Sequence, residues 1–339
     1  MPVHATENRV WRLNRHPVAC DFEAALSLEN GPVPVPAEGE VLIRNEYLSL
    51  DAGTRMWMSP RTDGYQPPLP LGTPMVGLVL GRIVDSRHAA YPIGAFVRAF
   101  GAWADYSCVA PATSHLFVLD ETVSDPRQHI GILGMNAWTA FVGITEAAGA
   151  RPGETVLVSA AAGTTGLLAA QIAKIMGCRV YGLAGGAAKC AYLNDEMRLD
   201  GAIDYKAPGV GTALEAIDGG IDVYFDNVGG PLLDEILPRM ALYGRIAVCG
   251  LVASYANDQP TGPQRFDQVL MRRLTIKGFF SPDFMHRGEA INRVMRRWLD
   301  AGLIRLPFDE SHGLEKTLVA YRKLFEGRNI GKVVVSLDH

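Results

Sequence analysis

The pattern of apolar and polar positions divides the chain into two parts. In residues 40–119, short apolar or alternating runs are interrupted by glycine and proline, for example at 41–47, 76–84, 95–100 and 104–109. Alternation over a few residues is typical of strands with one buried face. This part is therefore predicted to be a β-rich, barrel-like domain.

From about residue 125 to residue 300, apolar runs alternate with segments of helical periodicity. The runs lie at 156–158, 178–184, 221–226, 244–250 and 274–280. Strands that alternate with helices predict βαβ units and a parallel sheet. A last apolar run, at 333–336, follows a helical segment and is predicted to be a strand that returns to the first domain.

One segment joins an apolar run to a helix through a glycine turn. Residues 156–158 are consecutively apolar, as in a parallel strand covered on both faces. Gly163 and Gly166 follow, where a backbone can approach a pyrophosphate, and Ala161 replaces the first glycine of the usual fingerprint. The segment predicts a dinucleotide site, with a mere tight connection as the alternative.

The next strand indicates which dinucleotide. An NAD enzyme places Asp or Glu about 20 residues past the glycine turn. Here residues 185–189 are Gly-Gly-Ala-Ala-Lys, so there is room for a bulky group, a positive charge at Lys189 and no carboxylate. This favours the 2′-phosphate of NADP. The alternative is a solvated lysine at a helix start.

Composition fits this interpretation without changing it. The 339 residues allow about two domains. A net charge of −4 without a basic stripe argues against nucleic acid, and no segment has the length and apolarity of a signal peptide or membrane span. The five scattered cysteines favour the reduced state. We expect a cytoplasmic protein with a small-molecule substrate and no nucleic-acid or membrane partner.

Several short blocks, in order along the chain, match a known family. They are residues 47–51, 75–77, 133–135, 158–163, 201–206, 225–230 and 327–332. Through them the chain resembles the medium-chain dehydrogenase/reductase superfamily, and within it the zinc-free NADPH-dependent alkenal/one oxidoreductases, over nearly its whole length. The resemblance implies a Rossmann-type doubly wound parallel sheet plus a GroES-like β-barrel domain. The implied NADP-binding domain spans 126–304, and the substrate domain combines 1–125 with 305–339.

The residues themselves argue against zinc. A catalytic zinc needs Cys or His ligands near the start of the barrel domain, and a structural zinc needs closely spaced cysteines. The chain has neither, and Gly72, Thr73 and Pro74 stand where zinc-dependent relatives carry Gly-His-Glu. We therefore expect no metal. Without a Lewis acid, hydride addition to a carbon-carbon double bond conjugated to a carbonyl is favoured over direct carbonyl reduction.

The resemblance also implies a mechanism. Hydride arrives at the β-carbon of an enone or enal, and negative charge moves to the carbonyl oxygen. The nicotinamide ribose hydroxyl and Tyr255 would meet that charge. Tyr65, in a proline-rich loop, is a second catalytic candidate and a substrate-binding candidate, with a packed loop aromatic as its alternative. Either phenol, or solvent, could deliver the α-proton.

Cofactor residues follow from the same resemblance. It assigns Lys189 and Tyr205 to the 2′-phosphate, Asn227 to the ribose or adenine side, and Asn329 to the nicotinamide half. The alternatives are a strand aromatic for Tyr205 and a turn residue for Asn227. The remaining cofactor candidates are Thr139, Gly163, Thr164, Thr165, Gly166, Cys249, Gly250, Leu251, Tyr255, Phe279, Phe280 and Ser281. Core packing at a dimer edge is the alternative for the segment 279–281.

Two departures from the family pattern affect the substrate pocket. Residues 52–56 are Ala-Gly-Thr-Arg-Met where many relatives have a tyrosine, and residues 135–138 are Met-Asn-Ala-Trp where relatives have Met-Pro-Gly. Phe100 is predicted to bind substrate. Trp57, Trp103 and Trp138 could line the same aromatic pocket, but at least two of these four aromatic residues are expected to be plain core.

Three functions remain open at this point. The first is an NADPH-dependent enone or enal reductase, the second an NADPH-dependent quinone reductase, and the third an NADPH-binding protein without catalysis. Family habit further implies a homodimer that pairs edge strands near residues 274–280.

Overall fold

The structure is a computed structural model that describes residues 6–64, 67–255 and 262–337. It separates into two compact units, each with its own core. Unit 1 comprises residues 1–130, 308–328 and 332–339, and unit 2 comprises residues 131–307 and 329–331. Among the described residues, no helix has the length and apolarity needed to cross a membrane.

Unit 1 is built from two sheets that are mostly antiparallel. The smaller has the order β2-β1-β4, and the larger has the order β15-β16-β3-β5-β6-β8, with β7 also paired to β3. The strands are β1 (Glu7–Leu13), β2 (Leu26–Pro32), β3 (Val41–Leu50), β4 (Thr73–Pro74), β5 (Val76–Ser86), β6 (Phe96–Ala102), β7 (Tyr106–Val109), β8 (Phe117–Val118), β15 (Phe308–His312) and β16 (Lys332–Ser336). The β-rich first domain predicted from the alternating runs is confirmed.

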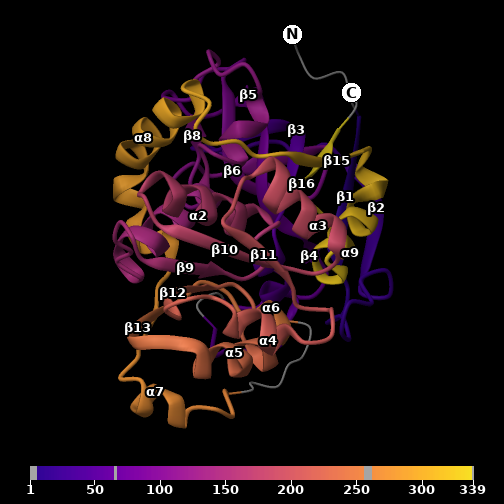
Figure 1. The fold of residues 1–339 in the computed structure, drawn as a ribbon. Coiled ribbons are helices and arrows are strands. Elements are labelled where there is room, and N and C mark those ends of the chain that lie inside the picture. Colours follow the sequence, from indigo (N-terminus) through magenta and orange to yellow (C-terminus); the bar gives the residue numbers. More distant parts are fainter. Residues whose placement is uncertain (1–5, 65–66, 256–261, 338–339) are drawn as a thin grey trace. The chain divides into compact units, whose positions relative to one another are not determined.

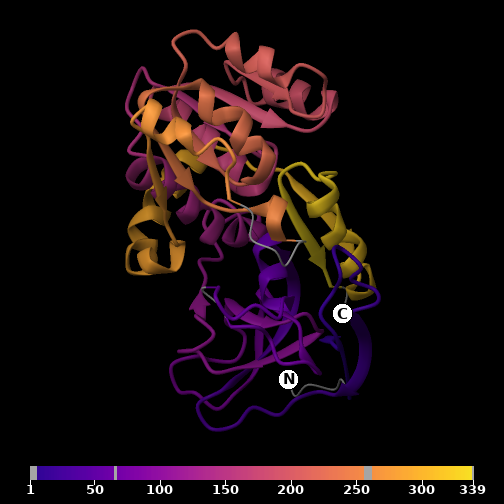
Figure 2. The same cartoon turned by 90° about the horizontal axis from the view of Figure 1, so that it is seen from below.

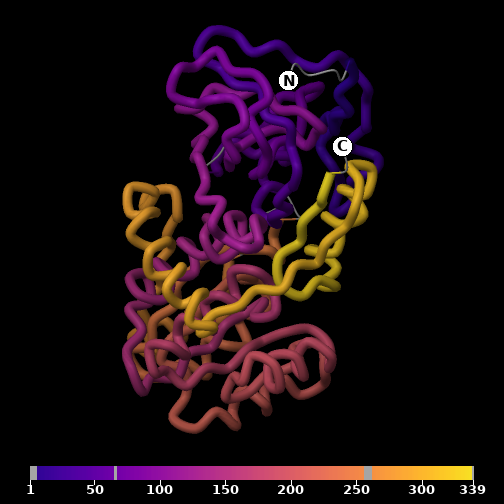
Figure 3. Tube along the Cα trace, turned by 90° about the horizontal axis from the view of Figure 1, so that it is seen from above, coloured from indigo at the N-terminus to yellow at the C-terminus, as the bar shows by residue number. Residues whose placement is uncertain are grey.

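The end of the chain completes unit 1. Strand β16 pairs antiparallel with β3, so the last apolar run does return to the first domain, and Figure 3 shows the yellow C-terminal trace beside the indigo N-terminal one. Helix α9 (Thr317–Glu326) lies beside β15 and β16 (Figure 2). The short helices of this unit are η1 (Ala52–Met58), η2 (Pro126–Ile130) and η7 (Leu314–Lys316).

A six-stranded parallel sheet forms the centre of unit 2. Its order is β11-β10-β9-β12-β13-β14, so the chain starts in the middle, moves to one edge and then crosses to the other (Figure 1). The strands are β9 (Thr155–Val158), β10 (Arg179–Ala184), β11 (Gly201–Asp204), β12 (Ile221–Asp226), β13 (Met240–Val248) and β14 (Thr275–Gly278). In such a sheet, ligands bind at the carboxyl ends of the strands where the order reverses.

Helices connect these parallel strands. They are α1 (Met135–Val142), η3 (Gly143–Ala147), α2 (Thr164–Ile175), α3 (Ala187–Ala191), η4 (Tyr192–Glu196), α4 (Val210–Glu215), α5 (Gly230–Ile236), η5 (Leu237–Arg239), α6 (Val252–Tyr255), α7 (Asp267–Met271), η6 (Ser281–Arg287) and α8 (Gly288–Asp300). Val156, Leu157 and Val158 of β9 are fully buried, as their consecutive apolar character predicted. The predicted βαβ organisation is confirmed.

Candidate functional site

In the turn between β9 and α2, the backbone at Ala160 lies close to the backbone at Gly163 and Gly166. Ala160 has a positive φ of 48°, and its carbonyl oxygen accepts a hydrogen bond from Gly163 N at 2.9 Å. A Cβ on Gly166 would lie 2.4 Å from that same oxygen, so no side chain fits there. The glycine therefore lets the helix begin directly against the strand, and Thr164 and Thr165 form its partly exposed first turn.

Residues 329–331 lie along this turn, although they are far away in the sequence. Gly331 N donates to Ala162 O at 2.8 Å, and the Thr164 hydroxyl donates to Gly331 O at 3.2 Å. The Asn329 side chain is buried and its Nδ2 donates to Gly331 O at 3.1 Å. The structure thus brings Asn329 to the predicted phosphate turn within unit 2.

Tyr205 and Gly185 meet where β10 and β11 end, and Lys189 follows on the short helix α3. Tyr205 N donates to Ala184 O at 3.2 Å, and the residue as a whole is 38% exposed. A Cβ on Gly185 would lie 3.0 Å from the Tyr205 hydroxyl and 2.8 Å from Lys206 Cε. Partial burial raises the pKa of Tyr205, so this phenol is neutral and can donate a hydrogen bond. Lys206 was not predicted, although it stands beside Tyr205 in a family block.

A carboxylate also reaches this end of the sheet. We stated that the end of β10 offers no carboxylate, but Asp204 arrives from the neighbouring strand β11. Its Oδ1 accepts hydrogen bonds from Gly186 N and Lys206 N, both at 2.9 Å, and these bonds lower the pKa of Asp204. Because β10 and β11 are parallel, their carboxyl ends lie at the same edge of the sheet. The sequence around β10 alone therefore does not reveal a carboxylate that comes from β11.

The other half of the carboxyl edge is a buried hydrogen-bond network around Asp226. Asp226 Oδ1 accepts from the Tyr224 hydroxyl at 2.8 Å and from Val228 N and Gly229 N, each at 2.9 Å. Ser159 adds a longer bond of 3.3 Å. Burial raises the pKa of Asp226 despite these bonds. The network fixes the turn after β12.

Asn227 is held by the same network. Its backbone N donates to Ser159 Oγ at 2.8 Å, and its side-chain Nδ2 donates to Ser159 O at 2.7 Å. Asn227 is buried, and its side chain bridges the ends of β12 and β9. The structure therefore places Asn227 at the point where the strand order reverses, with its amide group already oriented.

Tyr255 folds back onto the loop that follows β13. Its hydroxyl accepts a hydrogen bond from Leu251 N at 3.2 Å, and a Cβ on Gly250 would lie 3.2 Å from the same oxygen. Cys249 N and Gly250 N donate to the Asp226 carbonyl oxygen at 2.8 and 3.1 Å. Exclusion of water, followed by the charge of Asp226, raises the pKa of Cys249 to about 12, so its thiol is protonated at neutral pH.

The remaining cofactor candidates occupy two places in unit 2. Thr139 donates its hydroxyl to Met135 O at 2.8 Å within α1. Phe279 packs against Phe225, with the ring centroids 6.2 Å apart, and Ser281 is buried at the start of η6 after Phe280. The contact of Phe279 with Phe225 is core packing, and a role of residues 279–281 at the nicotinamide stays a prediction.

The predicted aromatic pocket residues do not form one group. Trp138 is buried, donates its indole N–H to Asn292 Oδ1 at 2.7 Å and belongs to unit 2. Trp103 is fully buried in unit 1, whereas Phe100 is half-buried there with its ring 5.8 Å from that of Trp57. Trp103 and Trp138 are thus core residues, as we expected of at least two of the four. Tyr65 lies outside the described residues.

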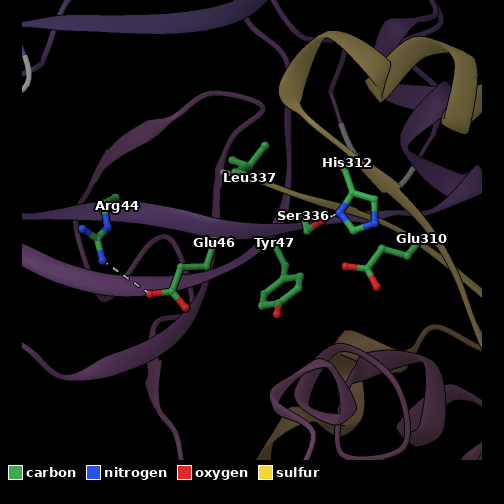
Figure 4. A pocket seen from close by; sticks show the side chains of 7 residues that line it. All are labelled: Arg44, Glu46, Tyr47, Glu310, His312, Ser336 and Leu337. Carbon is green, nitrogen blue, oxygen red and sulfur yellow. Dashed lines mark hydrogen bonds and ion pairs between the residues drawn. The ribbon is translucent and has the colours of Figure 1, made fainter. Parts of the chain in front are cut away.

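Figure 4 shows a separate polar pocket in unit 1. It is lined by Arg44, Glu46, Tyr47, Glu310, His312, Ser336 and Leu337. His312 Nδ1 lies 2.7 Å from Ser336 Oγ, and burial followed by the nearby Glu310 raises the pKa of Tyr47. None of the described residues that we predicted for cofactor, substrate or catalysis lines this pocket.

The described residues do not fit a zinc site. Over residues 6–64, 67–255 and 262–337, no group of three or more His, Cys, Asp or Glu side chains is placed to hold a metal ion.

Comparison with known proteins identifies the family. Residues 9–117 match the model described as N-terminal domain of oxidoreductase, and residues 164–297 match the model described as zinc-binding dehydrogenase. The chain is 37% identical over 335 residues to the NADPH-dependent curcumin reductase of Escherichia coli (strain K12), covering 97% of this chain and 96% of that protein. The chain belongs to the medium-chain dehydrogenase/reductase superfamily, in its branch of NADPH-dependent alkenal/one oxidoreductases.

Other members of the family support the same placement. The 2-alkenal reductase (NADP(+)-dependent) of Nicotiana tabacum is 36% identical, with 88% of each chain covered. The crystal structure of CurA from Vibrio vulnificus in complex with NADPH superposes with a TM-score of 0.91 at 34% identity, covering 98% of this chain and 99% of that one. The fold of this dehydrogenase/reductase is accordingly a Rossmann-type doubly wound sheet plus a GroES-like barrel, as predicted.

Proposed function

We propose that this chain uses NADPH to reduce the carbon-carbon double bond of α,β-unsaturated ketones or aldehydes. The observation that carries the proposal is the grouping, within unit 2, of the glycine turn before α2, of Tyr205 and Lys206 beside Gly185, and of a tyrosine folded onto the loop after β13. The names of the curcumin and 2-alkenal reductases support the reaction type.

The domain roles are part of this proposal. Residues 126–304 would form the NADP-binding domain, and residues 1–125 with 305–339 the substrate domain. All described cofactor candidates lie in unit 2, including Asn329, whose segment 329–331 runs along the phosphate turn. Phe100 lies in unit 1 and is the proposed substrate contact among the described residues.

The residues of unit 2 suit NADPH. Gly163 to Gly166 would hold the pyrophosphate, Lys189 and Tyr205 the 2′-phosphate, Asn227 the adenosine ribose or adenine, and Asn329 the nicotinamide half. The fit rests on the tight turn at Gly166, after which the first turn of α2 is partly exposed, and on Gly185, whose lack of a side chain lets Tyr205 and Lys206 lie over it. When bound, NADPH supplies the hydride that is transferred to the β-carbon of the substrate.

Tyr255 would stabilise the charge that develops on the substrate carbonyl oxygen. A hydroxyl can accept the hydrogen bond from Leu251 N and donate its own hydrogen elsewhere. A donor held in place before the reaction is worth more than one that must reorient. The α-proton would come from Tyr255, Tyr65 or solvent. The other cofactor candidates, Thr139, Cys249 to Leu251 and Phe279 to Ser281, would form the surroundings of the nicotinamide.

The experiment is a turnover assay that follows NADPH oxidation with aryl enones, 2-alkenals and quinones, and with NADH as the paired control. Turnover of enones or enals with a preference for NADPH supports the proposal. Turnover confined to quinones would replace it by quinone reduction. NADPH binding without turnover on any of these compounds would replace it by a non-catalytic binding function.

We further propose a homodimer that pairs the edge strands β14. This strand is exposed along its length, and exposed apolar residues lie beside it at Leu242, Tyr243, Leu270 and Met271. An unpaired edge with apolar neighbours suits pairing with a second copy. Ile276→Pro should then yield a monomer in light scattering, and a monomeric wild-type chain would contradict the proposal.

A cytoplasmic location completes the proposal. All five cysteines are free, with no disulfide between them, which suits a reducing compartment. Fractionation of cells that express the full chain tests it, and recovery in an oxidising compartment would contradict it.

A further inference from the structure

The end of the β10–β11 pair holds a side chain that the proposed function leaves without a role. The two strands are parallel neighbours, with Ala184 paired to Asp204, so the residues after both strands meet. Gly185 follows β10, while Tyr205 and Lys206 follow β11. A Cβ on Gly185 would lie 2.8 Å from Lys206 Cε and 3.1 Å from Lys206 Cδ, so the lysine stem lies over this glycine.

The position of Lys206 is set by its backbone. Lys206 N donates to Asp204 Oδ1, which also accepts from Gly186 N, so one carboxylate oxygen ties the residue after β11 to the turn after β10. The stem then runs beside the Tyr205 hydroxyl, which lies 3.0 Å from the same Cβ position on Gly185. The Tyr205 phenol and the end of the Lys206 stem therefore lie next to each other over Gly185.

The Lys206 ammonium forms no ion pair within 4.0 Å among the described residues, although its charge is one of the causes that lower the pKa of the neighbouring Asp204. Several other lysines are paired, such as Lys174 with Asp200 and Lys323 with Asp309. Among the residues that the structure describes, no carboxylate oxygen lies within 4.0 Å of the Lys206 ammonium. The nearby Asp204 uses Oδ1 for the two backbone N–H groups. Lys206 is exposed, so its ammonium is available to a ligand.

A phosphate monoester is the ligand chemistry that fits this surface. It carries close to two negative charges at neutral pH and three acceptor oxygens. An ammonium on a flexible stem binds phosphate as a point charge, and a neutral phenol donates one hydrogen bond. With Lys189 on the neighbouring helix α3, two ammonium groups and a phenol would match both the charge and the oxygens.

We propose that Lys206 is a specificity-determining residue that binds the 2′-phosphate of NADP and contributes to the discrimination against NAD. This inference rests on the proposed NADP site, because it places Lys206 at the same phosphate as Lys189 and Tyr205. In this arrangement Lys206, after β11, binds the 2′-phosphate in addition to Lys189 on α3. A side chain at Gly185 would displace the Lys206 stem, because its Cβ would lie 2.8 Å from Lys206 Cε.

Binding of adenosine 2′,5′-bisphosphate and of adenosine 5′-monophosphate to the full chain, measured by titration calorimetry, tests the proposal without turnover. Lys206→Ala should bind the bisphosphate about tenfold more weakly than wild type, because it loses one charged hydrogen bond to the 2′-phosphate. The monophosphate, which lacks the 2′-phosphate, should bind as it does to wild type. NADPH should weaken like the bisphosphate, NADH should be unaffected, and Lys206→Arg should retain most of the affinity.

The matched control is Lys316→Ala, which removes one exposed lysine from unit 1. It should leave all four affinities unchanged, because it alters net charge without altering the site. Lys189→Ala separates this inference from the NADP site itself. If Lys189→Ala weakens the bisphosphate and Lys206→Ala does not, the inference is wrong and the NADP site stands.

Two other outcomes would also contradict the inference. If Lys206→Ala weakens both nucleotides equally, Lys206 supports the local fold instead of binding the phosphate. If wild type binds both nucleotides equally, the 2′-phosphate site is wrong, and Lys206 has no role in cofactor choice. Circular dichroism of each variant would show whether the fold is retained.

Discussion

The two halves of the carboxyl edge of the parallel sheet hold their polar groups in opposite ways. Around Asp226, the polar groups are buried and bound to one another, and they fix the turns after β12 and β13. After β10 and β11, Lys206 and Tyr205 are exposed and extend from a surface opened by Gly185. The first half fixes the positions of backbone and side chains, and the second leaves a charged side chain exposed, where we propose that a ligand binds.

This difference predicts different consequences of substitution. A buried group without its partner pays the full loss of hydration, so changes around Asp226 should act on folding. An exposed group regains water when its partner is removed, so changes around Lys206 should act on affinity. Four comparisons test this distinction, in order of decreasing expected effect.

Asp226→Ala should lower the free energy of unfolding by about 4 kcal/mol, because the Tyr224 hydroxyl and the N–H groups of Val228 and Gly229 lose their acceptor. Urea unfolding measures it. The matched change at the exposed half is Asp204→Ala, which should cost far less stability. Equal losses in the two variants would contradict the contrast between the halves.

Gly166→Ala should destabilise the fold by about 3 kcal/mol, because the new Cβ meets the Ala160 carbonyl oxygen, which is backbone and cannot move aside. Gly185→Ala is its counterpart, since there the new Cβ meets the ends of two side chains. It should keep wild-type stability and weaken NADPH about fivefold relative to NADH. Thermal unfolding and nucleotide titration measure the pair, and a stable Gly166→Ala protein would refute the first expectation.

Tyr255→Phe should lower kcat about 100-fold with little change in the KM for NADPH, because it removes a donor needed only when charge develops on the substrate. Tyr205→Phe removes a phenol at the opposite half of the edge. It should raise the KM for NADPH and leave kcat close to wild type. Steady-state kinetics with an enone separates them, and a kcat effect confined to Tyr205→Phe would reverse the assignment.

Asp226 and Asp204 should give opposite pH dependences of stability. Burial raises the pKa of Asp226, so the folded chain keeps its proton after the unfolded chain has lost it, near pH 4. The stability from this group is therefore present below about pH 4 and is lost as the pH rises through the folded pKa. Asp226→Asn should remove that decrease.

Hydrogen bonds lower the pKa of Asp204, so its contribution is present above about pH 4 and is lost as the pH falls through the folded pKa. Asp204→Asn should therefore remove a loss of stability on the acid side. Urea unfolding of both variants and wild type over this range measures the slopes. Two slopes of the same sign would show that one carboxyl group has a different environment from the one described.

Local features were predictable from the sequence because they depend on neighbours along the chain. The strand at β9, the turn at Gly166 and the helix α2 follow from consecutive apolar residues and from glycine where no Cβ fits. The return of β16 to the first domain followed from its apolar run after a helix. The roles of the aromatic residues could not be predicted in the same way, because an apolar pattern does not distinguish a core residue such as Trp103 from a residue that lines a pocket.

The sequence by itself thus determined the fold class, the glycine turn between β9 and α2, and the family blocks that contain Tyr205 and Asn329. Only the tertiary structure decided which of these residues meet. The strand order places β11 beside β10, which brings Asp204 and Lys206 to Gly185, and it places β9 beside β12, which joins Ser159 to Asp226 and Asn227. Strand order depends on packing between distant segments, and no local pattern of residues encodes it.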